Sequence, residues 1–214
     1  MVMVAPISMG LSIIREKCLL KRWEHCFHKC MPRHLKKMSE EVIHENPWSV
    51  YKHDVYEKPD GSEGNYYYLE TQGSVCIVPV LPDGRIVLVL QHRYLAEKQS
   101  IELPSGKIKE GTSALESAQR ELLEETGWKA TDWIKAGEFS PSNGYLKTTA
   151  HVFIAQTTDQ QEQQLDDTEE IDVLYRRPDE FEDMITRGDI SDGYTIAAWS
   201  LVRHRFLDRK NNTS

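Results

Sequence analysis

Residues 106–127 constrain the fold of this chain more strongly than any other stretch, and their sequence is GKIKEGTSALESAQRELLEETG. Ser113 and Glu116 stand at the spacing of a capping box, in which each residue satisfies a free backbone amide at the start of a helix. Gly127 is of the residue type that most often ends a helix. The pattern therefore predicts a helix that begins near Thr112 or Ser113 and ends at Gly127 after about three and a half turns.

One face of this helix is predicted to be buried. Leu115, Ala118 and Leu122 recur at intervals of three and four residues, which is the period of a single helix face. We expect these three side chains to pack against the rest of the fold.

A group of carboxylates borders the predicted buried face. Glu121 and Glu125 lie one turn apart, with Glu124 between them on the flank. Like charges at this spacing destabilise an isolated helix by roughly a few tenths of a kcal/mol per pair, whereas a hard cation that takes oxygen ligands would reverse that effect. Arg120 can hold one carboxylate with its fork of donors, and a turn at 104–106 can direct a backbone carbonyl inward. The stretch predicts a divalent-metal site, with a solvated acidic helix as the alternative.

The whole stretch resembles the Nudix box, G-x5-E-x7-R-E-U-x-E-E-x-G-U, in which U is a bulky apolar residue. The matching positions are Gly106, Arg120, Glu121, Leu122, Glu124, Glu125, Gly127 and Trp128. One position departs from the box, because its first glutamate is Thr112 in this chain. That position mostly supports the loop in the family, and a threonine can cap the helix instead.

The resemblance extends over residues 46–206. Residues 101–106, IELPSG, look like the E-x-P-A-G segment of the branch that cleaves ADP-ribose and nucleotide sugars. Residues 91–94, QHRY, look like the Q-[YF]-R motif of that branch, and residues 189–198 look like its closing helix. The resemblance implies an α/β/α sandwich with a mixed β-sheet, commonly built as a homodimer whose N-terminal ribbon reaches over the partner.

Hydrophobic patterns along the chain agree with an α/β fold. Alternation predicts an antiparallel β-ribbon over residues 46–72, with strands at 49–56 and 66–70. Continuous apolar runs predict buried strands at 75–80 and 85–91. Further strands are expected at 133–139, 150–156 and 171–175, and helices at 178–187 and 191–206.

Length, charge and cysteine usage exclude several classes of protein. The 214 residues suit one domain, and no apolar run approaches the ~20 residues of a membrane span. The net charge of −8 argues against a broad nucleic-acid-binding surface. Four cysteines give no disulfide framework in a chain of this size, which favours a reducing cytoplasm as its location.

Residues 1–38 differ from the sequence that follows. They open apolar and then turn basic, with eight lysines and arginines against two glutamates. A secretory signal places its positive charges before the apolar run, so this order is not that of a signal peptide. We expect a basic N-terminal extension, disordered or helical, or else a biological start at Met31 or Met38. A single Nudix domain is expected over residues 39–214.

The resemblance implies an enzyme that hydrolyses the diphosphate bond of ADP-ribose or of other nucleoside diphosphate sugars, such as GDP-mannose. The products would be a nucleoside monophosphate and a sugar phosphate. The implied cofactor is Mg²⁺, with Mn²⁺ as a substitute, held by the Ser105 carbonyl, Glu121 and Glu125, with Glu124 as a further or water-mediated ligand. Glu121 and Glu125 are therefore the implied catalytic carboxylates, because the cation would neutralise phosphate charge and activate a water.

A base must also take the proton from the attacking water. The branch often supplies this base from the loop before a late strand, which corresponds to residues 165–171 here. Glu170 and Glu169 are the leading candidates, followed by Asp167. A solvated acidic loop and a site for an additional metal are the alternatives for these residues.

Four residues are predicted to bind the substrate. Arg93 would contact the diphosphate or the distal sugar through two parallel donors, unless it serves a structural ion pair. Trp48 resembles the tryptophan that stacks on the base in dimeric relatives, although tryptophan is also an ordinary core and interface residue. Ser142 and Asn143 would line the sugar side.

Two further functions stay open from the sequence. The same chemistry could act on a dinucleotide or a nucleoside triphosphate, although the ELPSG segment and the long ribbon favour diphosphate sugars. A sensor could share the fold and bind a nucleotide sugar without cleaving it. Such proteins usually lose carboxylates of the box, and here all three helix glutamates remain, which leaves Thr112 as the only support for a sensor.

Overall fold

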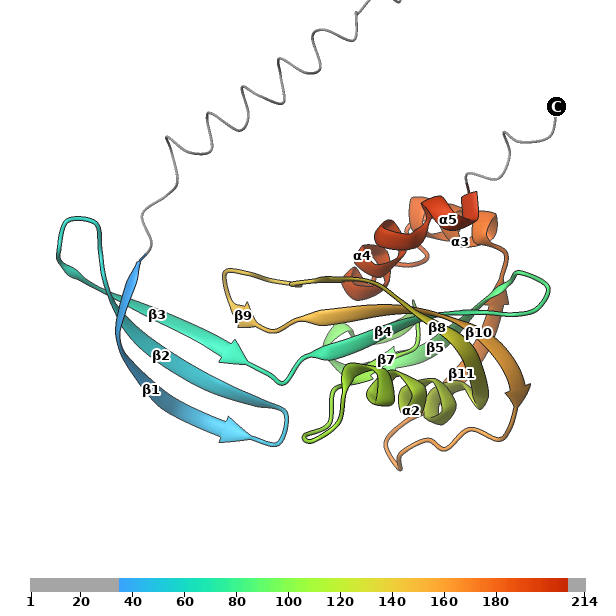
Figure 1. The fold of residues 1–214 in the computed structure, drawn as a ribbon, viewed down its shortest axis with the longest axis horizontal. Coiled ribbons are helices and arrows are strands. Elements are labelled where there is room, and N and C mark those ends of the chain that lie inside the picture. The colour runs from blue at the N-terminus through green and yellow to red at the C-terminus, as the bar shows by residue number, and fades with distance from the viewer. Residues whose placement is uncertain (1–34, 208–214) are drawn as a thin grey trace, which may run out of the picture. The chain divides into compact units, whose positions relative to one another are not determined.

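A computed structural model describes residues 35–207 (Figure 1). The basic extension predicted over residues 1–38 therefore lies almost entirely outside the described residues. The chain falls into two compact units. Among the described residues, one unit combines residues 35–40 with Asp54–Tyr66, and the other combines Glu41–His53 with residues 67–207.

The N-terminal ribbon has three long strands where the sequence predicted two. They are β1 (Lys36–Asn46), β2 (Ser49–Glu57) and β3 (Glu63–Glu70), in a sheet of order β1-β2-β3-β9. The short strand β9 (Leu146–Lys147) runs parallel to the end of β3. Nearly all side chains of β1 are exposed, so its sequence shows no alternation between a core face and a solvent face. The hydrophobic pattern therefore could not reveal it.

A seven-stranded sheet forms the centre of the larger unit. Its strands are β4 (Ser74–Val80), β5 (Ile86–Arg93), β6 (Lys98–Glu102), β7 (Ser105–Lys107), β8 (Trp128–Phe139), β10 (Ala150–Gln160) and β11 (Ile171–Arg176). The main path runs β11-β5-β4-β10-β8, with β6 beside β5 and β7 beside β4. The β4 and β10 strands are parallel, whereas β5 is antiparallel to β11 and β8 to β10, so the sheet is mixed as predicted.

Helices cover both faces of this sheet (Figure 1). One face carries α2 (Ala114–Thr126), and the other carries α3 (Pro178–Arg187), α4 (Gly193–Val202) and α5 (His204–Leu207). The helix predicted over residues 191–206 is thus two helices, which separate at Arg203. No helix within residues 35–207 is long and apolar enough to cross a membrane.

Two hydrophobic clusters hold these layers together. Successive residues of β4 point to opposite faces of the sheet. Val75 and Ile77 join a cluster with Ala118 of α2, whereas Cys76 and Val78 join a cluster with residues of α3 and α4. The continuous apolar run of this strand is therefore explained by burial on both faces. The predicted α/β/α sandwich is confirmed.

The start of α2 matches the prediction closely. Ser113 accepts a hydrogen bond from the Glu116 amide, and the Glu116 carboxylate accepts one from the Ser113 amide at 2.8 Å, which completes the capping box. Thr112 does not cap the helix. Its hydroxyl donates to the Lys109 carbonyl at 2.7 Å and lies 2.8 Å from the Ser117 hydroxyl, so Thr112 supports the loop before the helix.

The buried stripe of α2 differs from the prediction at one residue. Ala118 and Leu122 are fully buried, as expected. The prediction for Leu115 is wrong, because this side chain is 38% exposed. Ala114, rather than Leu115, is the residue of the first turn that packs against the apolar cluster under α2, and full burial along the helix begins at Ser117.

Gly127 ends α2 in the left-handed backbone region, with φ of 72°. Its amide donates to the Leu123 carbonyl at 2.9 Å, and its own carbonyl accepts from the Gln161 amide at 2.8 Å. A Cβ at this position would lie 2.1 Å from the Gln161 carbonyl oxygen. Glycine is therefore required here both by the backbone conformation and by the close approach of a neighbouring loop.

We expect Gly127→Ala to lower the free energy of unfolding by about 3 kcal/mol, because left-handed strain of ~1 kcal/mol adds to a clash of ~2 kcal/mol. Gly188→Ala is the matched control. Gly188 ends α3 with φ of 81° and has open space where a Cβ would lie, so it should lose only the strain. Urea unfolding of both variants tests this difference, and equal losses would contradict the close approach.

Candidate active site

Two carboxylates of α2 meet the segment that joins β6 to β7. The Glu125 side chain accepts a hydrogen bond from the Ser105 amide at 3.0 Å, and Glu125 is only 5% exposed. Glu121 lies against Gly106, because a Cβ at Gly106 would lie 2.2 Å from the Glu121 Cδ. The φ of Gly106 is not in the left-handed region, so space, rather than backbone freedom, explains this glycine.

Arg120 organises the rim of this group. Its Nη2 donates to Glu121 at 2.5 Å and to the Lys107 carbonyl at 3.3 Å, and its Nε donates to Glu124 at 3.3 Å. The sequence predicted that this guanidinium would hold one carboxylate, and it holds two. Arg120 also ties the helix to the end of β7, so the positions of Glu121 and Glu124 depend on the same side chain.

The electrostatic environment of the two inner carboxylates is unfavourable for negative charge. Burial raises the pKa of Glu125 well above its ordinary value, and the charges of Glu121 and Glu169 act in the same direction, while the hydrogen bond from Ser105 opposes them. Burial also raises the pKa of Glu121, and the ion pair with Arg120 opposes that effect. Desolvated carboxylates that repel one another are the surroundings that a bound cation would stabilise.

The residues present therefore fit a divalent cation. Glu121 and Glu125 supply hard oxygen donors beside the backbone of Ser105, and Glu124 stands at the rim. Within residues 35–207, no group of three or more His, Cys, Asp or Glu side chains is already arranged as metal ligands. Arg120 occupies one oxygen of Glu121 and one of Glu124. The ligand set predicted from the sequence stays a prediction.

A loop over residues 161–170 covers the C-terminal end of α2. The Gln163 side-chain amide donates to the Glu125 carbonyl at 2.6 Å and to the Ile171 carbonyl at 3.1 Å, and the Gln164 amide donates to the Glu124 carbonyl at 2.9 Å. The contacts to Glu124 and Glu125 satisfy carbonyls that the end of α2 leaves free, and the contact to Ile171 ties the loop to the start of β11. Sequence reasoning missed Gln163, because a glutamine within a polar run carries no signal of its partner.

The same loop carries the three candidate bases, and all three side chains are exposed. Glu169 is distinguished from the others by two observations. Its charge acts on Glu125, and its carboxylate accepts a hydrogen bond from the Asp166 amide at 3.1 Å. Glu170 directly precedes β11, and Asp167 lies in the turn before it.

Arg93 ends β5 and pairs with Glu102 at the end of β6. Its Nε and Nη2 donate to the two carboxylate oxygens at 2.8 and 2.5 Å. The hydrogen bond to Glu102 raises the pKa of Arg93, and the charges of Asp192 and Glu125 also raise it. The ion pair considered from the sequence is therefore present, and Arg93 lies within electrostatic reach of Glu125 on α2.

The sequence matches the family model described as NUDIX domain over residues 70–199. The chain belongs to the Nudix family. That match spans the main sheet, α2 and most of α4, and so includes each of the inner carboxylates described above.

Curated relatives agree with this Nudix assignment. The chain is 32% identical over 127 residues to an ADP-ribose pyrophosphatase of Bacillus subtilis, covering 58% of this chain and 68% of that protein. It is 29% identical over 147 residues to a methanol dehydrogenase activator of Bacillus methanolicus, covering 68% of this chain and 80% of that protein. The predicted family, its ADP-ribose pyrophosphatase branch and the enzyme class, a Nudix pyrophosphohydrolase, are confirmed.

A solved structure supports the fold independently. The crystal structure of an ADP compounds hydrolase superposes with a TM-score of 0.74 at 21% sequence identity, covering 86% of this chain and 100% of that chain. At this level of identity the similarity establishes a shared Nudix fold.

The remaining predicted substrate residues lie on exposed turns, Trp48 between β1 and β2, and Ser142 and Asn143 between β8 and β9. Trp48 is exposed, and the Lys107 Nζ lies 5.6 Å from the centroid of its ring. Ser142 and Asn143 are exposed between β8 and β9, where the Ser142 carbonyl accepts from the Leu146 amide at 2.9 Å. Among residues 35–207, the structure shows no hydrogen bond from these predicted residues to the α2 carboxylates, so their roles stay predictions.

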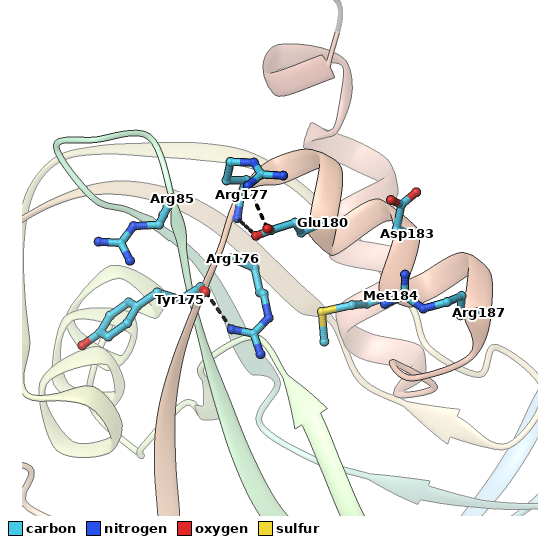
Figure 2. A pocket seen from close by; sticks show the side chains of 8 residues that line it. All are labelled: Arg85, Tyr175, Arg176, Arg177, Glu180, Asp183, Met184 and Arg187. Atoms are coloured by element: carbon cyan, nitrogen blue, oxygen red, sulfur yellow. Dashed lines mark hydrogen bonds and ion pairs between the residues drawn. The ribbon is translucent and has the colours of Figure 1, made fainter.

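A surface cleft of about 550 Å³ lies elsewhere on the Nudix domain (Figure 2). The cleft lies where Arg176 of β11 is paired with Ile86, the first residue of β5, whereas Arg93 is the last residue of β5. Its lining residues are Arg85, Tyr175, Arg176, Arg177, Glu180, Asp183, Met184 and Arg187. Three of the four arginines pair with nearby carboxylates, at Asp83, Asp179 and Asp189, so this cleft has little free positive charge.

The buried carboxylate of Glu125 allows a test that does not depend on turnover. Because the pKa of Glu125 is raised in the folded state, its contribution to stability is present at acid pH and is lost as the pH rises through that pKa. We expect Glu125→Gln to stabilise the metal-free protein at alkaline pH and to have a smaller effect at acid pH, because the amide carries no charge for burial to destabilise. Urea unfolding in a chelator, at acid and at alkaline pH, measures this gain.

The same variant should lose the response to metal. Added Mg²⁺ should raise the melting temperature of the unmodified protein, because a ligand that binds the folded state stabilises it. It should raise that of Glu125→Gln much less, because an amide is a weaker ligand for a hard cation. A variant that is less stable in chelator and still responds fully to Mg²⁺ would contradict the site described here.

Proposed function

We propose that this Nudix protein hydrolyses the diphosphate bond of ADP-ribose or of another nucleoside diphosphate sugar, yielding a nucleoside monophosphate and a sugar phosphate. The observation that carries the proposal is the buried Glu125 carboxylate, fixed by the Ser105 amide and placed beside Glu121. The relatives support ADP sugars in particular, because the similar Bacillus subtilis protein is an ADP-ribose pyrophosphatase. GDP-mannose is a second candidate of the same class.

Mg²⁺, with Mn²⁺ as a substitute, is the proposed cofactor. The Ser105 carbonyl, Glu121 and Glu125 would hold it, with Glu124 as a further ligand. When bound, such a cation offsets the negative charge of a diphosphate and acidifies the attacking water. The contribution of the chain is to hold two carboxylates together away from solvent, where their attraction for a cation is strongest.

Glu169 is the residue that we propose as the acceptor of the proton from water. Its charge acts on Glu125, which supports a position close to the cation site. The loop that carries it is anchored to α2 through Gln163, so the base and the ligands share one support. A carboxylate at that point can accept a proton while the phosphorus is attacked. Glu170 is the second candidate.

Arg93 is proposed to contact the diphosphate, and three other residues the rest of the substrate. The Arg93 side chain is 47% exposed although two of its N–H groups are engaged, so donors remain for an anion. The exposed ring of Trp48 is available for stacking on a base. Ser142 and Asn143 are proposed to line the sugar side.

A homodimer is the proposed assembly, and the cytoplasm is the proposed location. Strand β1 exposes the apolar side chains Met38, Val42 and Ile43, each about half accessible to solvent. A second copy that covers this strand would remove that apolar surface from water. Light scattering on the purified protein measures the mass of the particle, and a monomer would contradict the proposal.

A substrate panel tests the reaction directly. Purified protein with Mg²⁺ should release a phosphatase-sensitive product from ADP-ribose, ADP-glucose or GDP-mannose, and much less from diadenosine polyphosphates or nucleoside triphosphates. Turnover confined to the last two groups would instead favour the dinucleotide and triphosphate alternative. Binding of a nucleotide sugar by calorimetry without any turnover would favour a sensor.

Glu169→Gln and Glu170→Gln form a matched pair that tests the base. The two residues are neighbours in one exposed loop, so the substitutions change the net charge equally. We expect Glu169→Gln to lower kcat by ~100-fold, as removal of a general base commonly does, and Glu170→Gln to change it by less than about threefold. Steady-state kinetics decides between them, and the reverse order of effects would move the role to Glu170.

A further inference from the structure

Glu102 is a buried carboxylate to which the proposed reaction assigns no role. It is 2% exposed, and carboxylates are almost never fully buried unless they are paired. Both of its oxygens accept hydrogen bonds from Arg93, at 2.8 and 2.5 Å. A buried acceptor with both oxygens engaged fixes the plane of the guanidinium as well as its position, because the two bonds are parallel.

This pairing leaves one edge of the guanidinium available. An arginine carries five N–H donors, and the pair with Glu102 uses one on Nε and one on Nη2. The Arg93 side chain is still 47% exposed, whereas its partner has almost no contact with solvent. The pair is therefore anchored on its buried side and open on the other, which is the arrangement that suits contact with an anion.

Glu102 also begins a backbone segment in which each of the next three residues is bonded to a different element. The Leu103 amide donates to the Thr195 hydroxyl of α4 at 3.0 Å, and the Pro104 carbonyl accepts from the amide of Ile77 in β4 at 2.9 Å. The Ser105 amide then donates to Glu125 of α2 at 3.0 Å. The segment thus connects Arg93, through Glu102, and Glu125, through Ser105, over only three residues of backbone.

We propose that Glu102 is a positioning residue that holds Arg93 at a fixed distance from the α2 carboxylates, so that its open edge meets the diphosphate of the substrate. This inference rests on the proposed function. The two hydrogen bonds to Glu102 also keep the guanidinium engaged away from Glu125. An arginine paired with Glu125 would neutralise a carboxylate that the cation site needs.

The test is binding and turnover by Glu102→Gln in the full chain. The amide keeps one acceptor oxygen but loses the charge and the second acceptor. Calorimetry in chelator, where hydrolysis is suppressed, should show the Kd for ADP-ribose raised about tenfold. With Mg²⁺, KM should rise by a similar factor and kcat should change by less than about threefold, since contacts made equally in the ground state and the transition state alter KM alone.

A double variant separates positioning from a general loss of structure. If Glu102 acts through Arg93, then Arg93→Ala/Glu102→Gln should bind ADP-ribose no more weakly than Arg93→Ala alone. The double variant should also be more stable than Arg93→Ala, because it removes the buried unpaired charge that Arg93→Ala leaves. If the double variant binds ADP-ribose more weakly than Arg93→Ala, by the same factor that Glu102→Gln alone shows, the proposal is wrong.

Glu182→Gln is the structural control. Glu182 lies on α3, far along the chain from Arg93. Its carboxylate accepts a hydrogen bond from the indole N–H of Trp199 at 2.6 Å and pairs with Arg203. The Glu182→Gln variant should have a lower melting temperature and an unchanged Kd for ADP-ribose. If Glu102→Gln does not fold, Glu102→Asp keeps the charge while withdrawing it by one methylene, and it should raise the Kd in the same direction.

The outcomes distinguish this inference from the proposed function. An unmodified protein that cleaves ADP-ribose, beside a folded Glu102→Gln with the same Kd and KM, would overturn the positioning role and leave the function intact. An unmodified protein that neither binds nor cleaves any diphosphate sugar would overturn both.

Discussion

The hydrogen bond between the Ser105 amide and the Glu125 carboxylate is the contact on which the site depends. A carboxylate at this depth is costly unless its oxygens are satisfied, so the bond fixes α2 against the segment that leads into β7. That placement brings Glu121 so close to Gly106 that a side chain there would collide with it. The apolar packing of Ala118 and Leu122 holds the helix on the sheet, but the polar contact sets its register along the sheet.

The C-terminal end of α2 extends the same arrangement to the acidic loop. Helix ends leave carbonyls without partners, and here the Gln163 side chain and the Gln164 amide satisfy those of Glu125 and Glu124. The Gln161 amide donates to the carbonyl of Gly127, just past the helix. The loop therefore takes its position from the helix that carries the inner carboxylates rather than from the sheet alone. Gly127 permits this contact, since any larger residue would push away the backbone of Gln161.

Local patterns in the sequence predicted the parts of the fold that local forces determine. The capping box at Ser113 and the glycine at the end of α2 act within a single turn, so both were readable from the residues. The apolar runs of β4 and β5 were readable because they are buried on both faces. Strand β1 was not, because its exposed side chains follow no burial pattern. Leu115 fits the helical period and is exposed, because periodicity alone does not show that Ala114 is the residue of the first turn that meets the core.

The site itself was predictable only where a motif supplied it. The glutamates of α2 follow from their spacing. The choice between Glu169 and Glu170 does not, because neighbouring residues of an irregular loop point their side chains in different directions, and the sequence carries no periodic pattern that shows which one faces the site. The partner of Arg93 was also hidden. Glu102 lies nine residues away, and only the antiparallel pairing of β5 with β6, which sets Glu102 opposite Val89, puts the two side chains on one face.

Arg93 differs from the arginines of the cleft in Figure 2 in how firmly its partner fixes the orientation of its guanidinium. Arg85, Arg177 and Arg187 each pair with a carboxylate two residues away, and both members of each pair are exposed to water. Such pairs are weak and easily rearranged, so they specify no fixed direction for a ligand. The partner of Arg93 is instead buried, and a protein is strongly destabilised when a buried carboxylate loses the cation that pairs with it. The guanidinium is therefore held in one orientation before any anion arrives. The burial of its partner, rather than the number of nearby arginines, is what makes Arg93 the candidate for positioning an anion.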